Sequence, residues 1–200
     1  MLYYERKLKR KGFDFIIGVD EAGRGPLAGP VVAAAVVLNS YRFKNRIDDS
    51  KKLSSLSRER AFPEIIKKSV FGVSIVNEEE IDRLNIYKAT RQAMEEAVSC
   101  VVDKLSPCQK RRIHIIVDGN MPLNTTLACT CIVAGDSKSK SIAAASILAK
   151  VTRDHIMQLF DRLYPGYGFA KHKGYPTEEH KAALKRLGPS RIHRKSFCCV

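Results

Sequence analysis

The amino-acid sequence predicts an α/β fold, in which a mixed β-sheet is flanked by helices and followed by a small C-terminal helical extension. Two apolar runs joined by a short glycine-rich link open the chain and indicate an antiparallel strand pair. The later part alternates strand-like and helix-like patterns, which places helices on the faces of the sheet. With 200 residues and no repeat or linker, we expect one domain over 1–200, with its core at about 13–163 and the extension at about 164–200.

The strands are predicted from apolar runs that are rich in β-branched residues and bounded by glycine or proline. Short links favour antiparallel pairing among the first three. The five predicted strands are Phe15–Val19, Val31–Leu38, Val70–Val76, Ile113–Val117 and Leu127–Val133.

The helices are predicted from apolar residues that recur at helical spacing. Glu78–Leu84 and Asn85–Asp103 form one pair, and a long helix begins near Ser137. Thr177 is a typical N-cap for a last short helix that ends at Leu187.

The segment Arg58–Lys68 also has helical composition, but it contains Pro63. Proline biases the residue before it, here Phe62, away from the helical conformation. We therefore do not expect an uninterrupted helix in this segment.

The charge balance points to a polyanionic partner. Lysine and arginine outnumber aspartate and glutamate 35 to 21, which gives a net charge of +14 and makes nucleic acid the first choice. The longest apolar run, Val31–Leu38, is far shorter than the ~20 residues of a membrane helix, and the N-terminal segment lacks the apolar stretch of a secretory signal. We expect no membrane partner and a cytoplasmic location. The six cysteines show no metal-binding spacing and are expected to be free thiols.

Four acidic residues follow predicted strands at comparable places: Asp20, Glu21, Asp118 and Asp136. Carboxylates gathered without basic neighbours repel one another, so a cation between them would relieve the repulsion. Oxygen ligands suit Mg²⁺ or Mn²⁺ better than zinc, and two such ions can stabilise both the attacking and the leaving oxygen of a phosphoryl displacement. A single aspartate at a strand end is more often a turn residue, but four in a chain of net charge +14 favour a metal site.

The glycines after the first acids indicate a turn of bare backbone. On a regular strand Asp20 and Glu21 point to opposite faces, so the chain must leave strand geometry if both serve one site. Gly23 and Gly25 permit that, because glycine adopts positive φ and lets another backbone approach closely. Amides in the tripeptide Gly23-Arg24-Gly25 can bind a ribose 2′-hydroxyl, which distinguishes RNA from DNA, although a plain turn has the same sequence.

Three further features bear on nucleic-acid binding. Tyr175, between a glycine and a proline, either stacks on a sugar or base or packs within its own loop. Asp154 lies 18 residues beyond Asp136, roughly 27 Å along a straight helix, so we assign it to a helix surface or an ion pair with an arginine. For any single cation a solvated surface position is the more common role, but the candidate phosphate contacts are Lys51, Lys52, Lys138, Lys140, Lys150, Arg153, Lys171 and Lys173.

Residues 18–30, Gly-Val-Asp-Glu-Ala-Gly-Arg-Gly-Pro-Leu-Ala-Gly-Pro, resemble the opening signature of bacterial ribonuclease HII, the type 2 ribonuclease H, and further matches reach about Pro176. The resemblance implies an RNase H-like fold and an endoribonuclease that acts on RNA–DNA hybrids and on ribonucleotides embedded in duplex DNA. Such an enzyme hydrolyses the phosphodiester 5′ to the ribonucleotide by two-metal-ion catalysis and leaves 3′-hydroxyl and 5′-phosphate ends. It would remove misincorporated ribonucleotides and RNA primers, and we expect it to be a monomer.

The same resemblance implies roles for individual residues. The acids that would be catalytic and hold two Mn²⁺ or Mg²⁺ ions in the substrate complex are Asp20, Glu21, Asp118 and Asp136. The residues that would bind substrate are Gly23, Arg24, Gly25 and Tyr175. The tripeptide would read the 2′-hydroxyl, and the tyrosine would lie against the deoxyribose on the 3′ side. Lys51 joins them as our candidate phosphate contact.

Two other interpretations stay open at this point. The type 3 ribonuclease H has an additional N-terminal substrate-binding domain, whereas only about a dozen residues precede the first predicted strand here. A non-catalytic protein that binds hybrids would explain the positive charge, but four acids without a metal would weaken its hold on nucleic acid. Magnesium-dependent cleavage of a DNA duplex with one embedded ribonucleotide separates these interpretations.

Overall fold

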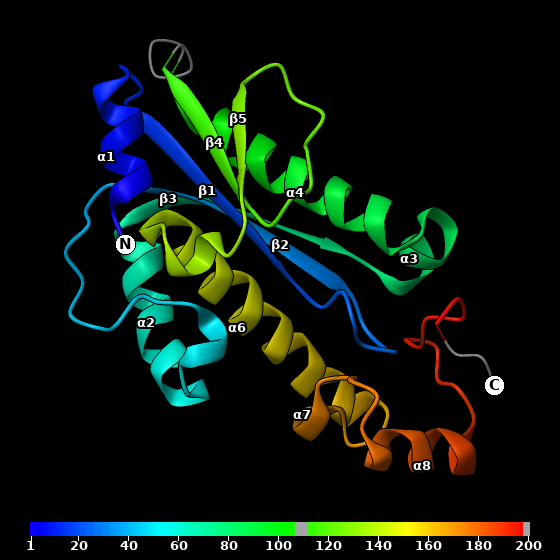
Figure 1. Ribbon diagram of the computed structural model, residues 1–200. Coiled ribbons are helices and arrows are strands. Elements are labelled where there is room, and N and C mark those ends of the chain that lie inside the picture. The colour runs from blue at the N-terminus through cyan, green and yellow to red at the C-terminus, as the bar shows by residue number, and fades with distance from the viewer. Residues whose placement is uncertain (107–111, 198–200) are drawn as a thin grey trace.

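The computed structural model describes residues 1–106 and 112–197 (Figure 1). Cys108, Cys198 and Cys199 lie outside the described residues. The cysteines within the described part, Cys100, Cys129 and Cys131, are free thiols, as expected. No helix of the described residues is both long and apolar enough to cross a membrane.

A five-stranded mixed sheet forms the centre of the fold, as the sequence predicts. Its spatial order is β3-β2-β1-β4-β5. The antiparallel pairs are β1 with β2 and β2 with β3, whereas β4 pairs in parallel with both β1 and β5. The strands are β1 (Phe15–Ala22), β2 (Val31–Leu38), β3 (Ser69–Val76), β4 (Ile113–Asp118) and β5 (Ala128–Ile132).

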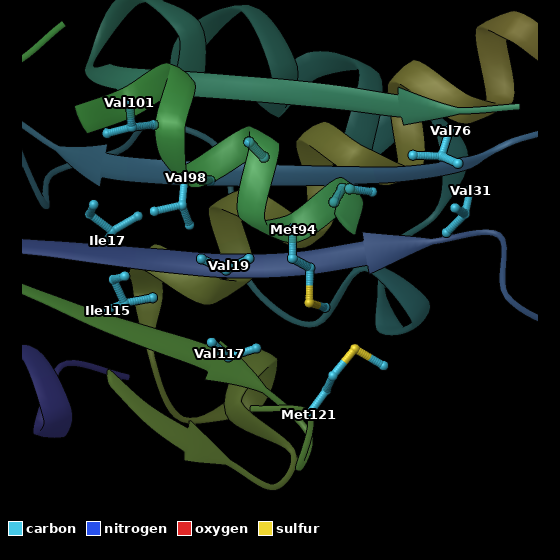
Figure 2. Close-up of a cluster of buried hydrophobic side chains, with 14 of the residues drawn as sticks. Ile17, Val19, Val31, Val76, Met94, Val98, Val101, Ile115, Val117 and Met121 are labelled. Carbon is cyan, nitrogen blue, oxygen red and sulfur yellow. The ribbon is translucent and has the colours of Figure 1, made fainter. Parts of the chain in front are cut away.

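One face of the sheet packs against α4 (Ile86–Asp103), which follows α3 (Glu78–Leu84). Successive side chains of a strand point to opposite faces, and Ile17 and Val19 of β1 belong to this face. Figure 2 shows Met94 of α4 among these strand residues. The cluster is apolar throughout and closely packed, so it fixes the strands whose ends carry the acids.

The opposite face packs against α6 (Lys140–Leu163) and α2 (Ser55–Lys67), while α1 (Tyr3–Arg10) lies near the start of α6 (Figure 1). The helix α6 touches β1 directly at Gly18. A Cβ added to Gly18 would lie 2.2 Å from the carbonyl carbon of Ser141, so only glycine allows this approach. The first turn of α6 therefore rests on β1 two residues before Asp20.

Contrary to our expectation, α2 continues through Pro63 without interruption. Ser54 caps its start, where the Ser54 hydroxyl accepts a hydrogen bond from the amide of Ser57 at 3.2 Å. A proline inside a helix costs about 3 kcal/mol. Ala61 and Ile65, on either side of it, are fully buried against α6, and this packing offsets the local preference.

The C-terminal extension contains α7 (Phe169–His172), which the sequence did not predict, and α8 (Glu178–Leu187). Thr177 caps α8 as expected, because its hydroxyl accepts a hydrogen bond from the amide of His180 at 3.2 Å. The extension then returns to the sheet, where His193 forms an antiparallel bridge with Ala28 in the link between β1 and β2. The described residues also form two 3-10 turns, η1 (Ser50–Lys52) and η2 (Gly135–Ser137).

Candidate metal centre and substrate cleft

Three carboxylates come together at one end of the sheet. One oxygen each from Asp20, Asp118 and Asp136 can be chosen so that all three lie within 4.8 Å of one another. Asp20 and Asp136 are buried, and Asp118 is partly buried. Oxygen ligands at this spacing have the chemistry and separation that a hard divalent cation requires.

The sheet itself aligns two of these acids. Val19 of β1 lies opposite Val117 of β4 in a parallel pair, so the next residues, Asp20 and Asp118, project on the same face. Asp118 then holds the third acid in place. Its Oδ1 accepts hydrogen bonds from the amides of Gly135 at 2.6 Å and Asp136 at 3.4 Å, which ties η2 to the end of β4.

The pKa shifts of Asp20 and Asp136 indicate buried acids whose negative charges are only partly balanced by Lys51. Burial raises the pKa of Asp20 well above its ordinary value, and the neighbouring charges of Glu21 and Asp118 raise it further. Burial, Asp118 and Asp49 together raise the pKa of Asp136 to about 6. Burial without a counter-charge favours the neutral acid, and a bound cation would reverse this, so the donor set fits a metal ion.

Glu21 stands beside this group rather than in it. The strand β1 keeps its pairing with β2 as far as Ala22, so the chain stays in strand geometry through Asp20 and Glu21. Burial raises the pKa of Glu21, the charge of Arg24 opposes this shift, and the charge of Asp118 adds to it, so the Glu21 carboxylate is still close enough to interact with the cluster. Glu21 forms an ion pair with Arg24 at 3.5 Å and lines the same cleft as Asp20.

Lys51 lies in η1, and its ammonium group interacts with the acids of the cluster. Its partial burial lowers the pKa of its ammonium group, but the charges of Asp136 and Asp20 outweigh this and raise the pKa overall. Asp49 caps the same turn, because its Oδ1 accepts a hydrogen bond from the Lys51 amide at 2.9 Å. The structure thus places Lys51 at the edge of the acid cluster, and it adds Asp49, which the sequence did not single out.

An open cleft of about 240 Å³ adjoins the acids. It is lined by residues that are far apart in the sequence, including Asp20, Gly23–Gly25, Lys51 and Tyr175. The loop of Tyr175 is held against the link between β1 and β2, where the Leu27 amide donates a hydrogen bond to the Gly174 carbonyl at 2.8 Å. The predicted tripeptide and the predicted tyrosine therefore face one space.

Several predicted phosphate contacts are engaged within the protein. Arg153 is fully buried and binds backbone carbonyls, so the prediction for this residue was wrong. Lys138 donates to the carbonyl of Val133 at 2.6 Å, and Lys150 forms an ion pair with Asp154 at 2.7 Å.

Asp154 lies outside the acid cluster, as expected, and Arg58 reaches it at 3.9 Å in addition to Lys150. The expectation of an arginine ion pair is confirmed. Sequence reasoning missed Arg194, which is fully buried beneath the tripeptide. It stands in a basic run without helical or strand periodicity, so no pattern distinguishes it from the exposed cations around it.

The sheet order, the helices on both faces and the acids at the ends of two adjacent central strands define an RNase H-like nuclease. The chain belongs to the ribonuclease HII family, whose model matches residues 17–200, and it is accordingly a hydrolytic nuclease.

Named relatives agree with this assignment. The ribonuclease HII of Geobacter sulfurreducens is 49% identical over 195 residues, which cover 97% of this chain and 87% of the relative. That of Caldanaerobacter subterraneus is 50% identical over 98% of this chain and 79% of the relative. Among solved structures, the RNase HII in the PCNA:RNase HII complex from Archaeoglobus fulgidus is similar with a TM-score of 0.75 and 25% identity, over 94% of this chain and 96% of that chain.

Proposed function

We propose that the protein hydrolyses the phosphodiester 5′ to a ribonucleotide, in RNA–DNA hybrids or within duplex DNA, and leaves 3′-hydroxyl and 5′-phosphate ends. One observation carries the proposal: a cluster of three carboxylates adjoins a cleft that is lined by bare backbone at Gly23–Gly25 and by Tyr175. The first part suits phosphoryl transfer and the second suits recognition of a ribose. We propose that the chain acts as one catalytic domain and a monomer in the cytoplasm, where it removes misincorporated ribonucleotides and RNA primers.

In this proposal Asp20, Asp118 and Asp136 hold the divalent ions, and Glu21 completes the donor set from the cleft wall. Two bound Mg²⁺ or Mn²⁺ ions would supply Lewis acids that stabilise the charge developing on the reacting phosphate. The raised pKa of Asp136 supports this role, because an acid cluster with too little positive charge binds cations well.

The remaining groups of the cleft orient the substrate. Lys51 lies beside the acids and would hold a phosphate of the cleaved strand, where its charge also balances theirs. Arg24 lies beside Glu21, and its side chain is half exposed. This exposure lets the guanidinium group turn towards a phosphate. Tyr175 is 41% exposed at the cleft and offers a ring face on which a sugar can pack.

The decisive experiment measures cleavage of three end-labelled duplexes: DNA with a single ribonucleotide, an RNA–DNA hybrid, and DNA alone. With Mg²⁺ or Mn²⁺ we expect cuts 5′ to the ribonucleotide in the first two and none in the third, and none at all with EDTA. Asp136→Asn should lower kcat by about 10²-fold or more. Binding of the hybrid without any cleavage would instead indicate a binding protein, and cleavage of all three duplexes would indicate an unspecific nuclease.

A further inference from the structure

Two arginines are buried directly behind the tripeptide Gly23–Gly25. Arg153 and Arg194 are both fully buried, and neither forms a salt bridge with a carboxylate in the part of the chain that the structure describes. Burial lowers the pKa of Arg194 to about 9 and that of Arg153 to about 10, which leaves both guanidinium groups charged at neutral pH. Burying an unpaired charge is expensive, so the arrangement calls for an explanation beyond packing.

The guanidinium group of Arg194 donates hydrogen bonds to backbone carbonyls of the tripeptide and of the link that follows it. Nη2 donates to the Gly23 carbonyl at 2.6 Å, and Nη1 donates to the Arg24 carbonyl at 3.0 Å. Nε and Nη2 both donate to the Gly29 carbonyl, at 2.9 and 2.7 Å. The planar fork of an arginine is suited to hold several acceptors in a fixed geometry.

Peptide geometry converts these contacts into an orientation of two amides. In a trans peptide the C=O of one residue and the N–H of the next belong to one plane and point in opposite directions, and the described residues contain no cis peptide bond. The Gly23 and Arg24 carbonyls point inward at Arg194, so the N–H groups of Arg24 and Gly25 point away from it, on the side of the cleft.

These two N–H groups are also unused. Neither the Arg24 amide nor the Gly25 amide donates a hydrogen bond to any described residue, whereas the Leu27 and Gly29 amides of the same link are both bonded. A peptide whose carbonyl accepts from a cation becomes a better N–H donor, because hydrogen bonds in a chain polarise one another. The tripeptide thus presents two free, polarised donors to the cleft.

We propose that Arg194 is a positioning residue, which turns the Arg24 and Gly25 amides towards the cleft so that they donate to the 2′-hydroxyl oxygen of the ribonucleotide. The inference rests on the proposed function and adds the element that builds the recognition site. That element lies in the C-terminal extension, outside the sheet and its acids, so it should govern the choice of ribose over deoxyribose without affecting the metal site.

Arg153 provides a matched control. It is equally buried and also binds carbonyls, those of Pro30 at 2.9 Å, Lys173 at 3.0 Å and Ala28 at 3.1 Å. The amides in the same peptide units are all engaged: Val31 lies in a strand, Gly174 donates to Nδ1 of His172 at 3.1 Å, and Gly29 donates to the Ile192 carbonyl at 2.8 Å. Arg153 also packs against Gly23, so Arg153→Lys should disturb the packing behind the tripeptide as Arg194→Lys does. It should keep the hydrogen bonds from Arg194 to the Gly23 and Arg24 carbonyls, which set the direction of the Arg24 and Gly25 amides.

The test measures the affinity for a DNA duplex with one ribonucleotide and for the same duplex in DNA alone, in EDTA so that nothing is cut. We expect the preference of the wild type for the ribonucleotide to fall about tenfold in Arg194→Lys and to persist in Arg153→Lys. The rise in Tm on adding Mn²⁺ should be equal in both variants. Unchanged preference in a folded Arg194→Lys protein overturns the inference while cleavage by the wild type still upholds the proposed function.

A measurement on the wild type stands even if Arg194→Lys does not fold. Hydrogen exchange followed by NMR should find the Arg24 and Gly25 amides unprotected in the free protein. Both should become protected with the ribonucleotide duplex, and much less so with the duplex of DNA alone. Protection already in the free protein, or none with either duplex, contradicts the inference.

Discussion

Gly25 and Tyr175 face each other across the substrate cleft: a Cβ added to Gly25 would lie 3.8 Å from Cε1 of the tyrosine. That distance is an ordinary van der Waals contact, and Gly25 does not have positive φ. The fold therefore tolerates a side chain here, and the glycine is needed only if something else must occupy the space. Gly23 differs, because its φ is +101° and a Cβ there would lie 2.1 Å from Nε of Arg153.

From this contrast we expect Gly25→Ala to keep the wild-type Tm and to lower kcat/KM on a single embedded ribonucleotide and on a long hybrid by similar factors, since both present the 2′-hydroxyl. Gly23→Ala should lower the Tm instead. Circular dichroism melts and cleavage kinetics separate the two effects. Wild-type activity in Gly25→Ala would show that the substrate does not approach this backbone.

Tyr175→Ala should discriminate between substrates in another way. If its ring packs on a deoxyribose, the loss falls mainly on the single embedded ribonucleotide, which is followed by DNA. The loss should be on the order of 1–3 kcal/mol, as for one stacking contact. Cleavage of the long hybrid is the internal reference. An equal decrease in kcat/KM on both substrates would mean that Tyr175 only packs within its own loop.

The acid cluster should bind divalent ions in the folded state only. A ligand at 100 times its Kd stabilises a protein by about 2.7 kcal/mol, so saturating Mn²⁺ should raise the Tm by about 5–10 °C. Asp20→Asn/Asp118→Asn should abolish most of this rise. Asp14→Asn is the control, because Asp14 is exposed and paired with Arg112 at 3.0 Å, far from the cluster in the sheet. Equal rises in all three proteins would place the ion elsewhere.

Asp136 should give the ion-free protein an unusual dependence on pH. Its pKa in the folded state is raised to about 6, above the ordinary 3.8, so the folded chain binds more protons between these values. Its contribution to the free energy of unfolding therefore increases as the pH falls from about 7 to about 4. His193 acts oppositely: burial and His180 lower its pKa to about 4, so its contribution is present above about 6.5 and is lost as the pH falls.

The two contributions are separated by comparing wild type with Asp136→Asn in urea denaturation with EDTA, since both proteins contain His193. The wild type should gain on the order of 1–3 kcal/mol relative to the variant between pH 7 and pH 4.5. Stabilisation by Mn²⁺ should weaken as the pH falls through 6, because the ion needs the ionised carboxylate. A difference between the two proteins that is constant with pH would contradict the assignment.

Glu5 should stabilise the start of α6 from a distance in sequence. It is 1% exposed, and its Oε1 accepts hydrogen bonds from the Ser139 hydroxyl at 2.6 Å and from the Ser141 amide at 3.0 Å. A carboxylate at this helix end also meets the positive end of the helix dipole. Glu5→Ala should lower the free energy of unfolding by about 1–3 kcal/mol, because it leaves buried donors unpaired.

The control for Glu5 is Glu59→Ala, which removes an exposed contact with His155 and should change stability by less than about 0.5 kcal/mol. Urea denaturation measures both. Because η2 immediately precedes α6, Glu5→Ala should also reduce the rise in Tm on adding Mn²⁺. Equal stability of the two variants would mean that Glu5 is not a working cap.

The parts of the fold that were predictable depend on local pattern. The apolar runs at β1 and β2 are rich in β-branched residues and short, which is typical of buried strands. A sheet that pairs such strands in parallel also brings together the acids at their ends. Pro63 misled the prediction, because a weak local preference yielded to the burial of Ala61 and Ile65. The sequence also grouped Glu21 with the three aspartates; the structure places it beside them on the wall of the same cleft, and its part in the donor set stays a prediction.

The recognition side of the cleft was less predictable for a physical reason. Gly23–Gly25 and Tyr175 carry local turn signals, but their shared space depends on how the extension folds back. Arg194 acts through contacts with backbone, which any residue provides, so nothing in the sequence near Gly23 reveals its partner. The acids could therefore be named from sequence, whereas the support for the tripeptide required the structure.

The bridge between Ala28 and His193 can form only after the C-terminal extension has been synthesised. In the described part of the chain, every strand and the three aspartates of the cluster precede the extension, so they are synthesised before Arg194, which lies behind the tripeptide. If Arg194 positions the tripeptide as we propose, selectivity for ribose forms last. In the proposed assignment, a chain that ends before Ser190 would keep the three aspartates but lack Arg194, so it would bind divalent ions without distinguishing ribose from deoxyribose.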